Sequence, residues 1–492
     1  MFFILLKLWE FCLVASHEDI YSPGSIMFDL SSATSITPGM ASDLPAPAMF
    51  SIDPPDKLEN NVVVLVTGAN TGLGLSTCCR LIDEFLHSHP VSHRLTVIFT
   101  TRNSPQKIKD TYAHLRNHLA RHDKGDSKNA SQRVRLLSET VDLANLKSVR
   151  ALSRRLNKNI PKLDAVILNA GIGGWSGLNW PLAVWCNLTD VVNATTWPVY
   201  KLSYVGMLTE KQTRLPEESP LGAVFCANVF GHYMLAHNLM PLLRRSGQPN
   251  GPGRVIWISS VEATIKLFDV DDIQGLKSTK AYESSKSLMD LLALTSDLPS
   301  TAPWVNSFLS TSDSDQSAEP CHGPPPKIYV SHPGIFGTSI VPLPLPLFWG
   351  MIGAFFLARW LGSPWHTIWT YLAASAPVWL ALSPQSVLDE AEAPYRQNGG
   401  GLVKWGSSCD RLGRDRPAST EVDGWGYGGV VGGAILEEDA RRRRKRGAKD
   451  LTAEDKARFE ELGRRCWQEM EQLRIEWEKL LDKDEAAAGA DK

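Results

Sequence analysis

Tyr282 and Lys286 are the pair of residues in this 492-residue chain best suited to chemistry. Positions i and i+4 of a helix share a face, so the lysine ammonium would lie beside the phenol. A nearby positive charge lowers the pKa of a tyrosine, which lets the phenol donate a proton near neutral pH. The pair follows Ser259 and Ser260, which end an apolar run that is typical of a strand. We therefore expect acid–base catalysis centred on Tyr282.

A glycine-rich turn carries the second signal. Gly68, Gly72 and Gly74 follow the apolar, β-branched run 62–66, and an amphipathic helix is expected to start close behind them. Glycines between a buried strand and a helix let the backbone approach a pyrophosphate at the helix N-terminus. The spacing GxxxGxG is weak evidence alone, but its place after a buried strand favours a dinucleotide site.

The end of the second expected strand indicates which dinucleotide is bound. A site for NAD places an acidic residue there to bind the ribose hydroxyls. No acidic residue lies between Thr96 and Lys109, and Arg102 occupies this region instead. A guanidinium pairs well with a 2′-phosphate, so we predict NADPH. The alternative is that Arg102 is an ordinary surface arginine.

Apolar strand patterns alternate with helical patterns over the middle of the chain. This alternation predicts an α/β fold with a doubly wound parallel sheet. The expected strands span 62–66, 95–100, 133–137, 163–168, 254–260 and 328–331, and the expected helices span 75–86, 108–122, 146–156, 223–243 and 280–294.

The length suggests about three domains by a prior of roughly 150 residues each, but the pattern favours one catalytic core at 61–340. We expect the remaining segments to be a disordered leader or misassigned start (1–60), two insertions (172–220, rich in tryptophan, and 297–326, flexible), an apolar membrane-associating segment (341–382), a Gly-rich C-terminal part (383–435), and a basic run with a charged amphipathic helix (436–492).

The apolar segment and the basic run each have competing interpretations. The run 345–358 has 14 residues, fewer than the roughly 20 that span a bilayer. It fits a hydrophobic face that lies in the membrane interface or over a lipid-binding pocket, or else an ordinary buried helix pair. The basic run 441–446 is most simply a solvated surface; anionic lipid headgroups and nuclear targeting are the alternatives.

Composition excludes several classes of protein. There are 51 basic and 53 acidic residues, giving a net charge of −2, so nothing drives binding to nucleic acid. The eight cysteines include no CxxC, which argues against a disulfide framework and against a metal site of zinc type. We expect a reducing compartment and no metal.

The ordered set of motifs resembles the short-chain dehydrogenase/reductase family, whose fold is Rossmann-type, over residues 62–340. The resemblance implies that Tyr282 is the acid/base, that Lys286 lowers its pKa and binds the ribose, that Ser260 steadies the carbonyl oxygen, and that Asn228 supports a proton relay. Ser259 remains the alternative serine. The implied cofactor-binding residues, besides Arg102, Tyr282 and Lys286, are Gly68, Asn70, Thr71, Gly72, Leu73, Gly74, Asp142, Asn169, Ala170, Gly171, Pro333, Gly334 and Thr338.

A narrower resemblance, to fungal 3-ketosterol reductases, covers about 60–430. It is carried by 259–264, 281–286, 330–335, 361–366, 404–408 and 421–426. It implies NADPH-dependent reduction of the 3-keto group of C-4 demethylation intermediates in ergosterol synthesis. It also implies the cytosolic face of the endoplasmic reticulum and lipid droplets, with the C-4 demethylation enzymes and oxidosqualene cyclase as partners. The alternatives are a reductase of another steroid or lipid ketone, and a scaffold for sterol-pathway enzymes.

Overall fold

The computed structural model describes residues 60–102, 104–124, 129–247, 250–310, 323–338 and 343–490. The predictions made for the leader and for the middle of the second insertion, 311–322, lie outside the described residues.

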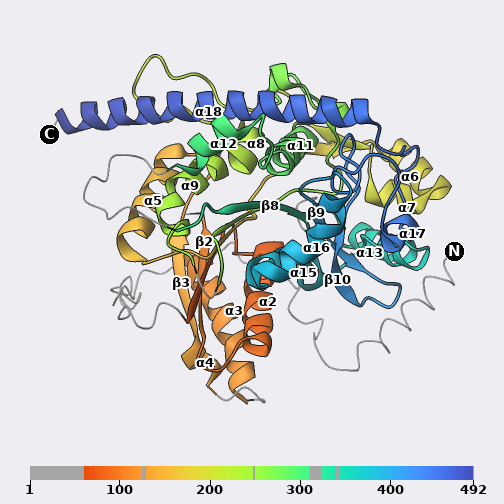
Figure 1. Cartoon of the computed structure of the whole chain (residues 1–492), viewed down its shortest axis with the longest axis horizontal. Coiled ribbons are helices and arrows are strands. Elements are labelled where there is room, and N and C mark those ends of the chain that lie inside the picture. Colours follow the sequence, from red (N-terminus) through yellow and green to blue (C-terminus); the bar gives the residue numbers. More distant parts are fainter. Residues whose placement is uncertain are drawn as a thin grey trace, which may run out of the picture. The chain divides into compact units, whose positions relative to one another are not determined.

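An eight-stranded sheet forms the centre of the described chain (Figure 1). Its order is β10-β9-β8-β7-β4-β1-β2-β3, and every neighbouring pair is parallel except β9 with β10. The strands are β1 (Asn61–Val66), β2 (Arg94–Thr101), β3 (Val134–Thr140), β4 (Ala165–Leu168), β7 (Arg254–Ile258), β8 (Lys327–His332), β9 (Lys404–Cys409) and β10 (Asp415–Ser419). The six expected strands and the doubly wound α/β fold are thus confirmed.

The strand pair β9 and β10 extends the sheet beyond the expected strands. Their sequences carry polar residues where an apolar run would mark a buried parallel strand. Lys404, Ser407 and Ser408 are nevertheless buried in β9. The pattern of hydrophobicity therefore gave no strand signal here.

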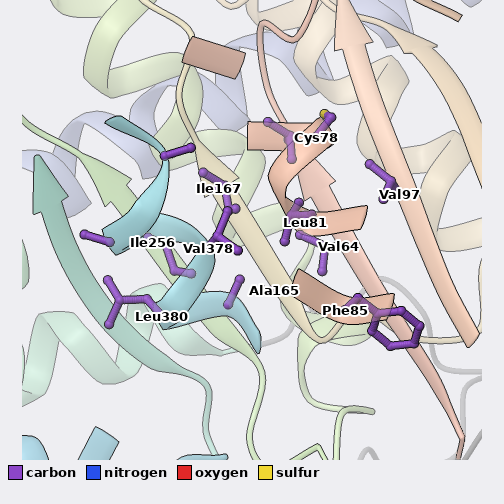
Figure 2. Close-up of a cluster of buried hydrophobic side chains, with 14 of the residues drawn as sticks. Val64, Cys78, Leu81, Phe85, Val97, Ala165, Ile167, Ile256, Val378 and Leu380 are labelled. Carbon is purple, nitrogen blue, oxygen red and sulfur yellow. The ribbon is translucent and has the colours of Figure 1, made fainter. Parts of the chain in front are cut away.

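Helices cover both faces of the sheet (Figure 1). One face carries α2 (Gly72–Ser88), α3 (Pro105–Lys124), α14 (Thr370–Ala373) and α15 (Ser375–Leu382), and the other carries α5 (Leu146–Asn159), α9 (Gly231–Asn238) and α11 (Ala281–Leu294). Alternate residues of the strands point to opposite faces, so each layer has its own core. Figure 2 shows one core, in which strand side chains meet α2 and α15: Val64, Val97, Ala165, Ile167 and Ile256 with Cys78, Leu81, Phe85, Val378 and Leu380.

The helix expected over 223–243 is interrupted. It consists of α8 (Ala223–Phe225), a π-helical turn η3 (Cys226–Phe230), α9 and α10 (Met240–Leu243). Pro241 lies in the first turn of α10, where a proline starts a helix rather than continuing one. The π-helical turn contains Asn228, one of the predicted site residues.

The described parts of the two insertions form helices and strands. Residues 172–220 include the antiparallel pair β5 (Trp175–Leu178) and β6 (Lys201–Ser203), with α6 (Trp180–Thr189) and α7 (Val191–Thr196) between them. The prediction that 297–326 is a flexible surface insertion is wrong for its first part. There α12 (Ala302–Leu309) buries Phe308 against α18.

The apolar segment divides into two different structures. Its second part, α14 and α15, packs on α2 and the sheet as an ordinary buried layer. Its first part, α13 (Leu345–Trp360), contacts α7 and leaves several apolar side chains exposed. Within the residues that the structure describes, no helix is long and apolar enough to cross a bilayer.

The long helix α18 (Ala453–Ala490) lies along α11 and α12 (Figure 1). The apolar face of this expected amphipathic helix is turned inward, where Phe459, Cys466, Met470 and Trp477 are buried. Trp467 is buried as well, and its indole Nε1 donates to the Leu292 carbonyl at 3.0 Å. The remaining short elements are α4 (Ala130–Arg133), η4 (Ile265–Leu267), η5 (Val270–Asp272), α16 (Gln385–Gln397) and α17 (Glu437–Arg441).

The basic run is largely neutralised by acidic residues of the same protein. Arg444 pairs with Glu421 and with Asp450, the latter at 2.7 Å. The other pairs join Arg441 to Glu437, Arg442 to Glu438 and Asp439, Arg443 to Asp190, and Lys445 to Asp423. These contacts give the run a structural role, in place of the freely solvated surface that its sequence suggests.

Candidate active site

The predicted site residues gather at the carboxyl ends of the parallel strands. Thr67 and Gly68 follow β1, Asn169 follows β4, and Ser259 and Ser260 follow β7. The chain order reverses between β1 and β4, and ligands of doubly wound sheets bind outside the strand ends at such a point. The fold thus places the glycine turn and the Tyr282 helix around one edge of the sheet.

The glycine turn has the close packing that a dinucleotide site requires. Gly68 has a φ of 67°, in the left-handed region. A Cβ on Gly74 would lie 2.3 Å from the Gly68 carbonyl oxygen, so no larger residue fits there. Asn70 and Thr71 lie on the turn, and α2 begins at Gly72, with Leu73 half-buried next to it. The donor groups of this helix N-terminus fit a pyrophosphate.

Thr67 ties the turn to the segment after β4. Its hydroxyl oxygen accepts hydrogen bonds from the backbone N–H groups of Asn169 (2.8 Å) and Ala170 (3.1 Å). It also lies 2.8 Å from His232 Nε2. Because His232 Nδ1 faces the Asn228 carbonyl at 2.9 Å, Nδ1 carries the hydrogen and Nε2 accepts. Burial lowers the pKa of His232 to about 4, which keeps the ring neutral.

Arg102 and Asp142 lie at the carboxyl ends of β2 and β3, on the same sheet edge as the glycine turn. Arg102 is exposed directly after β2. Asp142 is exposed after β3, and its carboxylate accepts from the Ala144 backbone N–H at 3.0 Å. The Arg102 guanidinium is not buried, and its positive charge suits a 2′-phosphate.

Tyr282 lies in the first turn of α11 with Ser260 beside it. Burial is the largest effect on the pKa of Tyr282 and raises it, and the charge of Glu262 raises it further. Interaction with the Ser260 hydroxyl acts in the opposite direction. The pKa of Tyr282 is therefore well above its ordinary value, opposite in direction to the sequence prediction.

Lys286 lies one turn further along α11. Its Nζ donates to the Ile258 carbonyl at 2.8 Å and lies 5.5 Å from the centroid of the Tyr282 ring. Burial lowers the pKa of this lysine to about 7; Asp290 raises the pKa and Lys404 lowers it further. The side chain thus exchanges protons near neutral pH, in place of acting as a permanent charge.

The two adjacent serines point in different directions. The Ser259 hydroxyl donates to the Lys286 carbonyl at 3.2 Å and accepts from Lys404 Nζ at 3.3 Å. Ser260 is the one that interacts with the phenol of Tyr282 and acts to lower its pKa. The geometry therefore favours Ser260 over Ser259 for contact with a substrate oxygen.

Asn228 holds the strand-end segment to α11. Its side-chain oxygen accepts from the Ile172 backbone N–H at 2.8 Å, and its Nδ2 donates to the Ile172 carbonyl and to Ser285 Oγ, both at 3.1 Å. A Cβ on Gly171 would lie 2.9 Å from this side chain. The π-helical turn aims the amide at these partners, as π-turns often do at functional sites.

The Pro333–Gly334 turn follows β8 at the same edge of the sheet. The Thr367 hydroxyl donates to the Pro333 carbonyl at 3.1 Å, and the Gly334 backbone N–H donates to His332 Nδ1 at 3.1 Å. Thr338 is half-buried four residues further on. This turn is therefore fixed from two sides.

Comparison with known proteins identifies the family. The chain is 62% identical to the 3-keto-steroid reductase erg27 of Aspergillus fumigatus over 451 residues, which is 89% of this chain and 99% of that protein. It is 40% identical to the ERG27 protein of Gibberella zeae (86% of this chain, 95% of that one) and 30% identical to that of Saccharomyces cerevisiae (75% and 92%). The chain belongs to the 3-keto-steroid reductase family.

The other comparisons add little to this assignment. No family model matches the chain. Among solved structures, the KRED1-Pglu enzyme aligns with a TM-score of 0.34 and 16% identity over 66% of this chain and 97% of its own. The fold assignment therefore rests on the sheet order itself.

Three residues of this reductase that the sequence did not mark lie beside the phenol. The Trp175 ring stands edge-on to the Tyr282 ring at 5.0 Å between centroids. Lys201 Nζ lies 4.1 Å from the centroid of Trp175 and pairs with Glu262 at 2.6 Å. Only the high tryptophan content of the first insertion hinted at this contribution.

A buried ion pair contacts the serine segment of the reductase site. Lys404 Nζ donates to Asp290 Oδ2 at 2.6 Å and to the Ser260 carbonyl at 2.7 Å, and both charged side chains are 2% exposed. Lys404 comes from β9 and Asp290 from α11. Sequence reasoning missed this pair because the two residues are 114 positions apart and no local pattern joins them.

Proposed function

We propose that this protein reduces the 3-keto group of C-4 demethylation intermediates of sterols to the 3β-hydroxyl, with NADPH as the reductant. The observation that carries the proposal is that Ser260 lies next to Tyr282 and acts on its pKa, at the sheet edge that also carries the glycine turn, in a chain 62% identical to a 3-keto-steroid reductase.

The cofactor, when bound, supplies the hydride, and the chain's own residues handle the oxygen. Because its pKa is well above neutrality, the Tyr282 phenol keeps its proton until the substrate oxygen becomes basic. Ser260 donates a hydrogen bond to the same oxygen as its negative charge develops. Lys286, with a pKa of about 7, then resupplies the proton from solvent.

The choice of NADPH over NADH rests on Arg102. This side chain is exposed at the end of β2, and no acidic residue lies near it in the sequence to repel a 2′-phosphate. A 2′-phosphate carries the charge that Arg102 can bind in a bidentate way.

The route of an apolar substrate is part of the proposal. Exposed apolar side chains cluster on α6 and α13, including Trp185 (67% exposed), Leu188 and Trp349. A patch of this kind suits contact with a lipid surface. By resemblance, we place the protein at the cytosolic face of the endoplasmic reticulum and on lipid droplets. The resemblance also suggests association with the C-4 demethylation enzymes and oxidosqualene cyclase.

Tyr282→Phe tests the proposal directly. With a 4-methyl-3-ketosterol in detergent, the variant should lose at least 100-fold in turnover, as expected for loss of a general acid, while its affinity for NADPH is retained. Tyr329→Phe is the matched control, because Tyr329 lies buried in β8 and hydrogen-bonds Gln385. Retained turnover in Tyr282→Phe would exclude the assigned role, and a preference for non-sterol ketones would favour a reductase of another lipid ketone.

A second experiment separates catalysis from scaffolding. Wild type and Tyr282→Phe are compared in cells that lack the endogenous 3-ketosterol reductase. Sterol synthesis should be restored only by wild type. Full restoration by the variant would indicate a scaffold for sterol-pathway enzymes.

A further inference from the structure

Two histidines of α3 point at one carboxylate of α2, away from the glycine turn and Tyr282. His118 Nε2 and His122 Nε2 each lie 2.6 Å from Asp83 Oδ1. The three candidate ligand atoms all lie within 4.8 Å of one another. His118 and His122 are four residues apart, so consecutive helical turns place both imidazoles on one face.

The chemistry of this set matches a transition-metal ion. Imidazole nitrogen and carboxylate oxygen are the ligands that Zn²⁺ takes in sites with three protein ligands and one open position. Two histidines at i and i+4 on a helix are a recurring half of such sites. The carboxylate comes from a separate helix, so a bound ion would link α2 to α3.

A neighbouring residue orients the carboxylate in the way that metal sites require. The Tyr371 hydroxyl donates to Asp83 Oδ2 at 2.7 Å, which leaves Oδ1 directed at the two imidazoles. Such outer partners fix ligand orientation in metal sites.

The surroundings favour an ion that enters from solvent. The side chains of Asp83, His118 and His122 are 21%, 13% and 29% exposed, so the cluster is accessible on one side. Cys79, one turn before Asp83 on α2, is buried and does not belong to this cluster of candidate ligand atoms. One coordination position is then open to water.

We propose that Asp83, His118 and His122 bind one divalent transition-metal ion, with Zn²⁺ as the best fit. The ion acts as a structural link between α2 and α3, and through Tyr371 to α14. This site is separate from the proposed reductase chemistry, and neither proposal depends on the other.

Metal content and affinity test the site. The full chain is stripped with a chelator, dialysed and titrated with Zn²⁺ against a chromogenic competitor. Wild type should bind one equivalent, and His118→Gln, His122→Gln and Asp83→Asn should each lower the affinity at least 100-fold. Tyr371→Phe should lower it about 10–100-fold, the range for loss of an outer partner.

His114→Gln is the matched control. His114 lies one turn before His118 on the same helix and does not belong to the cluster. This variant should bind Zn²⁺ like wild type. Equal binding by all variants, or no binding by wild type, would overturn the proposal.

Co²⁺ provides a readout on the wild-type chain itself, which guards against variants that fail to fold. A four-coordinate site with two histidines should give visible d–d absorption at one equivalent of Co²⁺, and one equivalent of Zn²⁺ should abolish it. Absorption typical of hexa-aqua Co²⁺ would show that the cluster is held by hydrogen bonds alone.

Discussion

Replacing Lys404 by Met should strongly destabilise the protein. The substitution keeps the length of the side chain but leaves the Asp290 carboxylate buried without its counter-ion. Breaking a buried pair from one side costs about 3–5 kcal/mol. Asp290 Oδ1 already lacks a hydrogen-bond partner, and the Ser260 carbonyl loses one of its two donors, keeping only the Ala263 N–H at 3.3 Å. We expect a loss of about 3–5 kcal/mol in the free energy of unfolding at pH 7.

The loss should shrink at low pH. Burial raises the pKa of Asp290, and Lys404 opposes that rise. Without Lys404 the pKa rises further, so the folded variant holds a proton that the unfolded chain has released, and its stability falls as pH rises. At about 1.4 kcal/mol per pH unit, moving from pH 7 to pH 5 should recover up to about 2.7 kcal/mol of the deficit.

Urea unfolding at pH 5 and pH 7 measures both effects. Lys327→Met is the matched control, because Lys327 forms a pair of similar length with Asp389 (2.8 Å) at the surface; it should change stability by less than about 1 kcal/mol. The double variant Lys404→Met/Asp290→Leu should regain most of the loss, since an apolar replacement of both partners is often near neutral. If Lys404→Met alone cost as little as the control, or if the double variant were no more stable than the single one, the reasoning would be refuted.

Three further predictions concern charge, packing and the cofactor. The pKa of Lys286 is about 7 in the folded protein, against about 10.4 unfolded, so the unfolded chain binds more protons in this window. Wild type should therefore gain about 3–4 kcal/mol relative to Lys286→Met between pH 7 and pH 10 in urea unfolding. Trp467→Ala should lower the unfolding free energy by about 3–5 kcal/mol, whereas Ile475→Ala, at an exposed position of the same helix, should lower it by less than about 1 kcal/mol. Arg102→Ala should weaken NADPH binding by about 1.5–3 kcal/mol in fluorescence titrations and leave NADH binding unchanged; an equal loss with both cofactors would remove Arg102 from phosphate recognition.

The sequence predicted those parts of the site that local patterns determine. The glycine turn follows a buried strand, and Tyr282 and Lys286 share a helix face, so neither needs distant information. The serine pair was different. Neighbouring residues at a strand end point to opposite faces, and no local signal says which one faces the site. The structure shows which serine faces the site, because Lys404 Nζ donates a hydrogen bond to Ser259 Oγ.

Lys404 itself shows why the remainder could not be predicted. It lies in β9, a strand whose buried side chains are polar, more than 100 residues after Tyr282. The buried charge of Lys404 is balanced by the Asp290 carboxylate. The two residues meet only because β9 joins the sheet next to β8, which the sequence alone does not show. The π-helical turn at Asn228 could not be predicted either, because the sequence pattern of this segment is that of one continuous helix.

The position of α18 has a consequence for protein synthesis. This helix covers α11, which carries Tyr282 and Lys286, yet it starts 159 residues after α11 ends. At 5–20 residues per second, a ribosome needs roughly 8–32 s to make the intervening chain. During that time Tyr233 and Phe308, which pack against Trp467 in the finished protein, lack their cover. The nascent chain therefore presents an aromatic surface suited to a chaperone until translation delivers the last helix of the described chain.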